Sequence, residues 1–223
     1  MSDPEGNAAR LAQLVAADHC ALLIQEVQQG VVGADSGLPE LAAATAEVRL
    51  VEHVAELARG ARRAGVPVVH CTAENLPDGF GSNRNARLFA AARKAGLHNA
   101  PGSASVQPVP AVGPEPGDLV LPRFHGLSPM SGTSLDQLLR NEGVTTVVIV
   151  GVSLNIAIPN LVFDAVNRAY QVVVVADAVA GVPLEYGAQV LEHTLALVAT
   201  VTTGAELLAA WAGQVFEARP SYM

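Results

Sequence analysis

The chain has 223 residues, of which 50% are hydrophobic, 15% charged and 4% aromatic, and its formal net charge is −8. This length is sufficient for one full α/β core, and the high hydrophobic content argues against disorder. Lys and Arg are scattered along the sequence rather than clustered. The chain therefore lacks the basic patch that is typical of proteins that bind nucleic acid or anionic membranes. We therefore expect neither nucleic acid nor a membrane among the partners.

The two cysteines, Cys20 and Cys71, lie in apolar stretches that are typical of buried core thiols. Neither belongs to a CxxC or Cys/His pattern of the kind that holds a structural metal. The N-terminus lacks the basic and apolar layout of a signal peptide, and no apolar run reaches membrane-spanning length. The sequence thus predicts a cytoplasmic protein with reduced thiols.

Apolar runs alternate with amphipathic stretches along the chain, as in proteins built from βαβ units. Strands are expected at 20–27, 66–71, 118–123, 145–151 and 171–180. Helices are expected at 48–65, around 85–95, and at 134–143, 158–170, 184–199 and 204–212. The first of these helices ends at Gly65, which is a suitable C-cap residue.

These elements predict a three-layer α/β/α fold with a doubly wound, mainly parallel sheet of about six strands. We expect a single domain over residues 1–223, with an N-terminal extension at 1–17. Residues 96–117 contain five prolines and show no usable periodicity. They could link two domains, but a surface excursion is the better interpretation because neither flank would form a complete core alone.

Polar residues at the carboxyl ends of the strands are the candidates for a site, because doubly wound sheets bind ligands there. Glu26 follows the first strand, where a carboxylate is costly to bury unless it is functional or ion-paired. Arg123 ends the strand DLVLPR and could pair with Glu26 or with a substrate carboxylate. His125 follows closely and could be an acid, a base, a substrate ligand or a solvated loop histidine.

The remaining strand ends offer further candidates, among them Glu74 after the strand at 66–71. His70, within VVHCTA, is either a satisfied core histidine or a pocket residue, and Asp177 is better explained as a cap of the following turn. Ser153 and Asn155 come directly after the strand at 145–151. The chain contains no GxGxxG after a strand and no P-loop, and GVSLN is not the GxSxG of a serine hydrolase.

Four segments in order resemble the isochorismatase-like (cysteine hydrolase) superfamily: ALLIQEVQQG, VLPRFHGLSPMSGTSLDQLL, VVIVGVSLNIAI and YQVVVVADAVAG. The resemblance runs from about residue 18 to about residue 205. It implies that Glu26, Arg123 and Ala157 stand where the family has an acid/base Asp, a Lys and a nucleophilic Cys. Family members also often have a strained, non-proline cis peptide bond at the position that matches Val152–Ser153, and the sequence leaves open whether this chain has it.

The departures from the family pattern bear on the chemistry. Without a thiol at Ala157, an acyl-enzyme should not form at this position. The Asp/His metal cluster of some relatives is also missing from HCTAENLPDGF, so we expect no metal, and the resemblance implies no cofactor. Family members without the Cys, the isochorismatases proper, cleave a vinyl ether by protonation, for which a carboxylic acid such as Glu26 is needed.

Two functions stay open. One is a hydrolase or lyase that acts without a thiol on a small, anionic metabolite, and the other is a catalytically silent binding or structural protein. In the first, Glu26, Arg123 and His125 would be catalytic; Gln28, Ser153, Asn155, Ala157, Phe124 and His70 would contact the substrate. The enzyme is favoured because Glu26 and Arg123 keep the charges of the residues that they replace.

Two further expectations complete the sequence-based picture. A relocated nucleophile at Cys71 beside His70 is disfavoured, because adjacent strand residues point to opposite faces of a sheet. Family members commonly assemble, and the helices at 158–170 and 184–212 carry little charge, so we expect a homodimer or homotetramer.

Overall fold

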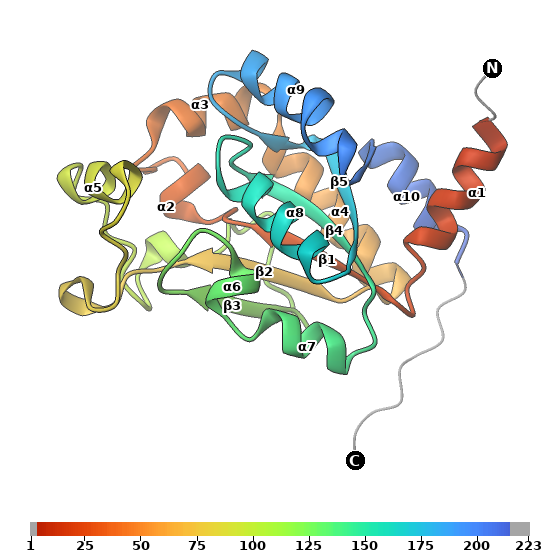
Figure 1. Ribbon diagram of the computed structural model, residues 1–223, viewed down its shortest axis with the longest axis horizontal. Coiled ribbons are helices and arrows are strands. Elements are labelled where there is room, and N and C mark those ends of the chain that lie inside the picture. Colours follow the sequence, from red (N-terminus) through yellow and green to blue (C-terminus); the bar gives the residue numbers. More distant parts are fainter. Residues whose placement is uncertain (1–3, 215–223) are drawn as a thin grey trace.

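The computed structural model describes residues 4–214 and has a six-stranded sheet in the order β3-β2-β1-β4-β5-β6 (Figure 1). The strands are β1 (Cys20–Gln25), β2 (Val68–Ala73), β3 (Leu119–Arg123), β4 (Thr146–Val152), β5 (Gln171–Ala180) and β6 (Thr200–Thr202). Every neighbouring pair is parallel. The chain winds outward from β1 in both directions, which confirms the predicted doubly wound sheet and places its switch point between β1 and β4.

Helices cover both faces of this sheet. On one face lie α1 (Pro4–Leu14), α4 (Leu50–Ala64) and α10 (Gly204–Ala212); on the other lie α7 (Leu135–Asn141), α8 (Ala157–Asn167) and α9 (Leu184–His193). Successive strand residues point to opposite faces, so Leu22 and Ile24 join the first core while Leu23 joins the second. The two cores make the fold a three-layer sandwich.

The central strands are mostly apolar because both of their faces are covered, and their polar residues are Gln25 in β1 and Thr146 in β4. All seven residues of β4 and all six of β1 are buried, as expected for parallel strands inside an α/β sandwich. The helix α4 ends at Gly65, whose left-handed conformation (φ 74°) confirms the predicted C-cap. No helix among residues 4–214 is long and apolar enough to cross a membrane.

Several elements differ from the sequence-based expectation. The predicted extension contains α1, which packs against α10 while the indole of Trp211 donates to the Val15 carbonyl. The loop expected after β1 contains α2 (Gln29–Val32) and the Ala-rich α3 (Pro39–Glu47), whose apolar residues show no clear helical period. The helix expected at 184–199 ends at His193, and β6 follows it; three residues are too few to show a strand pattern.

The stretch at 96–117 folds back onto the segment that follows β1. It contains one 3₁₀ turn (Ala104–Val106), and Val109 donates its N–H to the carbonyl of Val27. Gln28 also forms an isolated antiparallel bridge with Pro108. The expected helix around 85–95 is α5 (Arg87–Lys94), whereas residues 1–3 and 215–223 of the expected domain lie outside the described part.

Candidate active site

An ion pair between Glu26 and Arg123 lies at the carboxyl ends of the strands. Arg123 is the last residue of β3, and its Nη2 is 2.5 Å from Oε1 of Glu26, which directly follows β1. The two side chains are only 9% and 17% exposed, respectively. Glu26 has a left-handed backbone conformation with φ 52°, which is uncommon for a residue with a side chain and tends to occur at functional sites.

The carboxylate of Glu26 is held through one oxygen only. Oε1 accepts hydrogen bonds from Arg123 and from Nε2 of the buried Gln25, at 2.8 Å. Among the described residues, no hydrogen bond reaches Oε2 of Glu26. Oε1 of Gln25 is buried without a partner, because the amide presents its N–H₂ rather than its oxygen to the carboxylate. Glu26 is therefore oriented firmly while one carboxylate oxygen stays available.

Arg123 also holds the loop that follows β3. Its Nη1 donates to the carbonyls of His125 and Gly126, and its side chain passes so close to Gly132 that a Cβ there would lie 2.9 Å from Cγ of Arg123. The guanidinium thus connects Glu26 with the His125–Gly126 backbone. With these partners, the guanidinium is not an unpaired cation that is available to bind a substrate.

The strand β4 ends in a tight segment that leads into α8. Gly151 has φ 108°, and a Cβ there would lie 2.1 Å from the carbonyl oxygen of Gln25, so only glycine fits. The peptide bond between Val152 and Ser153 is cis. Ala157 is the first residue of α8, so no helical carbonyl accepts its N–H, and its side chain is a methyl group.

The side chains of Asn155 and Gln28, the two amides predicted to contact the substrate, form hydrogen bonds with backbone groups instead. Asn155 donates to the carbonyl of Val182 and accepts from the Val182 N–H. Gln28 is fully buried, donates to the carbonyls of Ala73 and Ser105, and accepts from the Ala73 N–H at 2.7 Å. Both amides fix loops at the strand ends.

A cavity of about 630 Å³ lies at these strand ends. Of the residues singled out from the sequence, seven line it: Glu26, Arg123, Phe124, His125, Ser153, Asn155 and Ala157. The structure does not bring Gln28 or His70 to its wall. Glu74, the strand-end candidate after β2, also lines it, and so do Leu88 and Phe89 on α5, which sequence reasoning left out.

His70 instead belongs to a buried polar network on the α4 face of the sheet. Its Nε2 is 3.0 Å from Oδ2 of Asp118, and Nη2 of Arg62 donates to the same oxygen at 2.6 Å. Burial lowers the pKa of His70 despite the neighbouring carboxylate. Burial alone would raise the pKa of Asp118, but hydrogen bonds from Arg62, the Glu115 backbone and His70 together hold it below its usual value.

We expect this network to make the fold sensitive to acid. The pKa of His70 is lower in the folded chain than its ordinary 6.5, so the unfolded chain binds the proton more readily as the pH falls below that value, and stability is lost. Asp118 adds to the loss below its ordinary 3.8, because its folded pKa is lower still. Melting temperatures between pH 7 and pH 5 should fall more steeply for wild type than for His70→Gln; parallel slopes would contradict this role.

The cysteines are poorly placed for nucleophilic chemistry. Cys20 and Cys71 are free and buried. Burial raises the pKa of both thiols, and that of Cys71 to about 12, so neither provides thiolate near neutral pH. Among residues 4–214, no group of three or more His, Cys, Asp or Glu side chains could hold a metal ion.

The sequence pattern of the isochorismatase domain matches residues 20–206. This range includes all six strands, Glu26, Arg123 and the start of α8. The chain therefore belongs to the isochorismatase family.

Particular relatives come from bacteria and archaea. The chain is 32% identical over 142 residues to a ureidoacrylate amidohydrolase RutB of Methylorubrum extorquens. That match covers 58% of this chain and only 56% of the relative's length. A second RutB, from Pseudomonas syringae pv. syringae, is 26% identical over 140 residues, 58% of this chain and 57% of that relative.

Solved structures share the whole architecture. An isochorismatase family protein from Desulfovibrio vulgaris superposes with a TM-score of 0.71 and 26% identity, covering 86% of this chain and 98% of that one. An N-carbamoylsarcosine amidase from Thermoplasma acidophilum superposes with a TM-score of 0.66 and 25% identity, covering 83% and 96%.

Proposed function

We propose that this protein is a hydrolase that cleaves an amide-type C–N bond in a small metabolite, with Glu26 as the acid/base group and without a cysteine nucleophile. The observation that carries the proposal is the geometry of Glu26: Oε1 is anchored by Arg123 and Gln25, and Oε2 is left for a water or substrate proton. The amide as substrate is suggested by the relatives, which are named as an amidohydrolase and an amidase.

In the proposed reaction, Oε2 of Glu26 takes a proton from a water molecule as the water oxygen adds to the substrate carbonyl carbon. The C–N bond then breaks, and the carboxyl of Glu26 returns the proton to the leaving nitrogen. The products are a carboxylic or carbamic acid and an amine or ammonia. No covalent intermediate on the protein is needed, which is consistent with the methyl group of Ala157 at the start of α8.

Other cavity residues have supporting roles in this scheme. The N–H of Ala157, at the positive end of α8, would donate to the oxyanion that forms on the carbonyl oxygen. Ser153 lines the cavity and would orient the water. His125, which is exposed at the cavity, would contact the leaving group, while Phe124 shapes the binding space.

A turnover screen tests the proposal. The panel contains ureidoacrylate, N-carbamoyl amino acids, simple aryl and alkyl amides, and isochorismate as a vinyl ether, each with and without EDTA. We expect release of amine or ammonia from an amide, unaffected by EDTA. If no compound is turned over and none shifts the melting temperature, the catalytically silent alternative replaces the enzyme.

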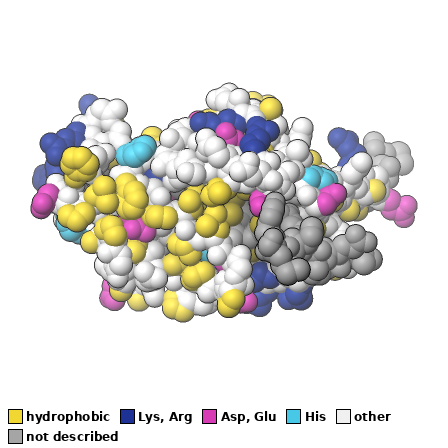
Figure 2. Space-filling view, turned by 90° about the horizontal axis from the view of Figure 1, so that it is seen from below, with side chains coloured by type: hydrophobic (Ala, Val, Ile, Leu, Met, Phe, Trp, Pro, Cys, Tyr) yellow, Lys and Arg dark blue, Asp and Glu magenta, His cyan; other side chains and the backbone are white. Residues whose placement is uncertain are grey.

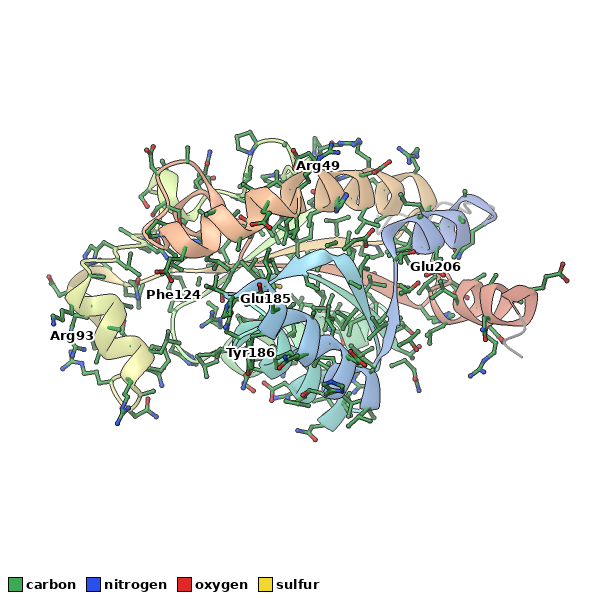
Figure 3. All side chains as sticks on the ribbon, turned by 90° about the horizontal axis from the view of Figure 1, so that it is seen from above. Arg49, Arg93, Phe124, Glu185, Tyr186 and Glu206 are labelled. Carbon is green, nitrogen blue, oxygen red and sulfur yellow. The ribbon has the colours of Figure 1, made fainter. Side chains whose placement is uncertain are left out.

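We also propose that the chain self-associates through the face formed by α8 and α9. Phe163 on α8 and Tyr186 on α9 are more than 40% exposed, and Leu197, which follows α9, is 80% exposed; Tyr186 is labelled in Figure 3. Large exposed apolar side chains on one face are typical of subunit interfaces. Sedimentation velocity should give a dimer or tetramer of the 23.0 kDa chain, and Phe163→Glu should shift it to the monomer. A wild-type monomer would contradict the interface.

A further inference from the structure

The charges inside the cavity are out of balance. Three glutamates are among the residues that line it, the partly buried Glu26 and Glu74 and the exposed Glu40, whereas Arg123 is the one Lys or Arg that the described residues contribute to the lining. Because the guanidinium of Arg123 already serves Glu26 and two backbone carbonyls, the described part of this wall leaves no unpaired Lys or Arg side chain for a substrate anion. An excess of two negative charges remains there.

Glu74 is the carboxylate best placed to act on a ligand. It directly follows β2, is partly buried, and its backbone N–H donates to the carbonyl of Arg123, which ties it to the end of β3. Its Oε1 accepts from the hydroxyl of Thr72 at 3.2 Å, and no ion pair to Glu74 is present among residues 4–214. A partly buried carboxylate without a cation is costly to desolvate further, so it disfavours an anion beside it and favours a positive group.

Most of the remaining wall is apolar, although polar residues such as Ser153 and Asn155 also line it. Hydrophobic side chains from three segments surround the space: Leu38 and Leu41 near α3, Leu88 and Phe89 on α5, and Phe124 and Leu127 after β3. Figure 2 shows hydrophobic side chains gathered toward the end of the molecule that carries α5, at the left. A cavity of about 630 Å³ with such walls suits a bulky apolar group rather than a small, strongly hydrated ion.

The basic residues of α5 do not change this balance. Arg87, Arg93 and Lys94 are exposed and are not part of the cavity wall. Arg93 lies on the outer side of α5, away from the sheet (Figure 3). Their charges lie in water and are screened over about a Debye length, so they act weakly on a ligand inside the cavity.

We infer that the substrate is an amide that carries a bulky apolar group and no negative charge, and that Glu74 favours a positively charged form of it. The inference rests on the proposed hydrolysis only in naming the substrate an amide. The charge and the apolar group of the substrate concern binding, which can be measured without turnover. It differs from the sequence-based expectation of an anionic metabolite, in which Arg123 would hold the substrate anion.

Three probes with one scaffold test the inference: phenylacetamide substituted in the para position with an aminomethyl, a methyl or a carboxylate group. Dissociation constants are measured by calorimetry on wild type and on Glu26→Gln, so that slow turnover does not disturb the binding data. We expect the cationic and neutral probes to bind, and the cationic probe to bind at least about fivefold more tightly than the anionic one. Tightest binding of the anionic probe, or no binding of any probe at millimolar concentration, would overturn the inference.

A matched pair of variants tests whether Glu74 causes the preference for the cationic probe. Glu74→Gln removes one charge inside the cavity, and Glu47→Gln removes one from an exposed position of α3 that does not line it. The preference for the cationic over the anionic probe should shrink severalfold in Glu74→Gln and stay unchanged in Glu47→Gln. Equal effects of the two variants would show that only the net charge matters, against a role for Glu74.

This design distinguishes a failure of the inferred substrate class from a failure of the proposed hydrolysis. If the affinity order holds but no probe is hydrolysed, the substrate class stands and the proposed hydrolysis is wrong for these amides. If the anionic probe is both bound and hydrolysed best, hydrolysis stands and the substrate class is wrong.

Discussion

Glu26→Gln is expected to lower kcat on an amide substrate by roughly 10²- to 10⁴-fold, the usual contribution of a general acid/base group. A glutamine amide keeps the size of the side chain and can still accept a hydrogen bond from Arg123 through its oxygen. It cannot take a proton from water near neutral pH, so the chemical step is lost while the cavity keeps its shape. Steady-state kinetics and a ligand-induced thermal shift measure the two consequences separately.

Cys71→Ala is the control for this variant. The Cys71 thiol is buried, and burial raises its pKa to about 12. It lies near both Glu26 and Arg123, so substituting it shows whether a general disturbance of the strand ends is enough to lower activity. We expect kcat within about twofold of wild type, since no step of the proposed reaction uses it. Full activity in Glu26→Gln would contradict acid/base catalysis by Glu26.

Arg123→Gln is expected to cost both stability and activity. The substitution leaves the Glu26 carboxylate without its cation and the His125 and Gly126 carbonyls without their donor. Loss of one partner of a buried ion pair typically destabilises a protein by roughly 3–5 kcal/mol. Chemical denaturation should show a loss in or just below this range because Glu26 is partly exposed, and kcat should fall because the carboxylate is no longer oriented.

Two further variants separate the charge of Arg123 from its geometry. Arg123→Lys keeps the charge but cannot reach both Glu26 and the loop carbonyls, so it should recover only part of the stability. In the double variant Glu26→Gln/Arg123→Gln, no carboxylate is left unpaired, and the loss should be smaller than the sum of the two single losses. Strict additivity would mean that the ion pair contributes little to the fold.

The central sheet could be predicted from the sequence because it follows from local pattern, and the pairing of Glu26 with Arg123 was one of the two alternatives that the sequence left open. Fully buried parallel strands appear as continuous apolar runs, and charged residues at their ends, Glu26 and Arg123, have few places to go except toward each other. The resemblance to the family added the positions of Ala157 and of the cis bond at Val152–Ser153, which the structure has.

Other parts of the site depend on tertiary contacts that no local pattern encodes. Gln28 and His70 are polar residues on or after apolar strands. Only the structure shows that Gln28 bonds to the backbone of Ala73 and that Nε2 of His70 pairs with the carboxylate of Asp118, while Nδ1 of His70 is buried without a partner. The apolar wall from α5 could not be foreseen, because a lone amphipathic helix does not reveal which surface it will cover. Glu74 was a strand-end candidate like Glu26, but no sequence pattern indicated that it would line the cavity without a cationic partner.

Hydrolysis of one amide substrate by wild type, Glu26→Gln and the double variant Cys20→Ala/Cys71→Ala tests the central claim most directly, with the intact mass of each protein recorded during turnover. The account predicts that activity is lost in Glu26→Gln alone and is kept in the protein without thiols. It also predicts that none of the three proteins carries a covalent adduct during turnover. Loss of activity in the thiol-free protein, or an acyl adduct on Cys71 of the wild type, would contradict it.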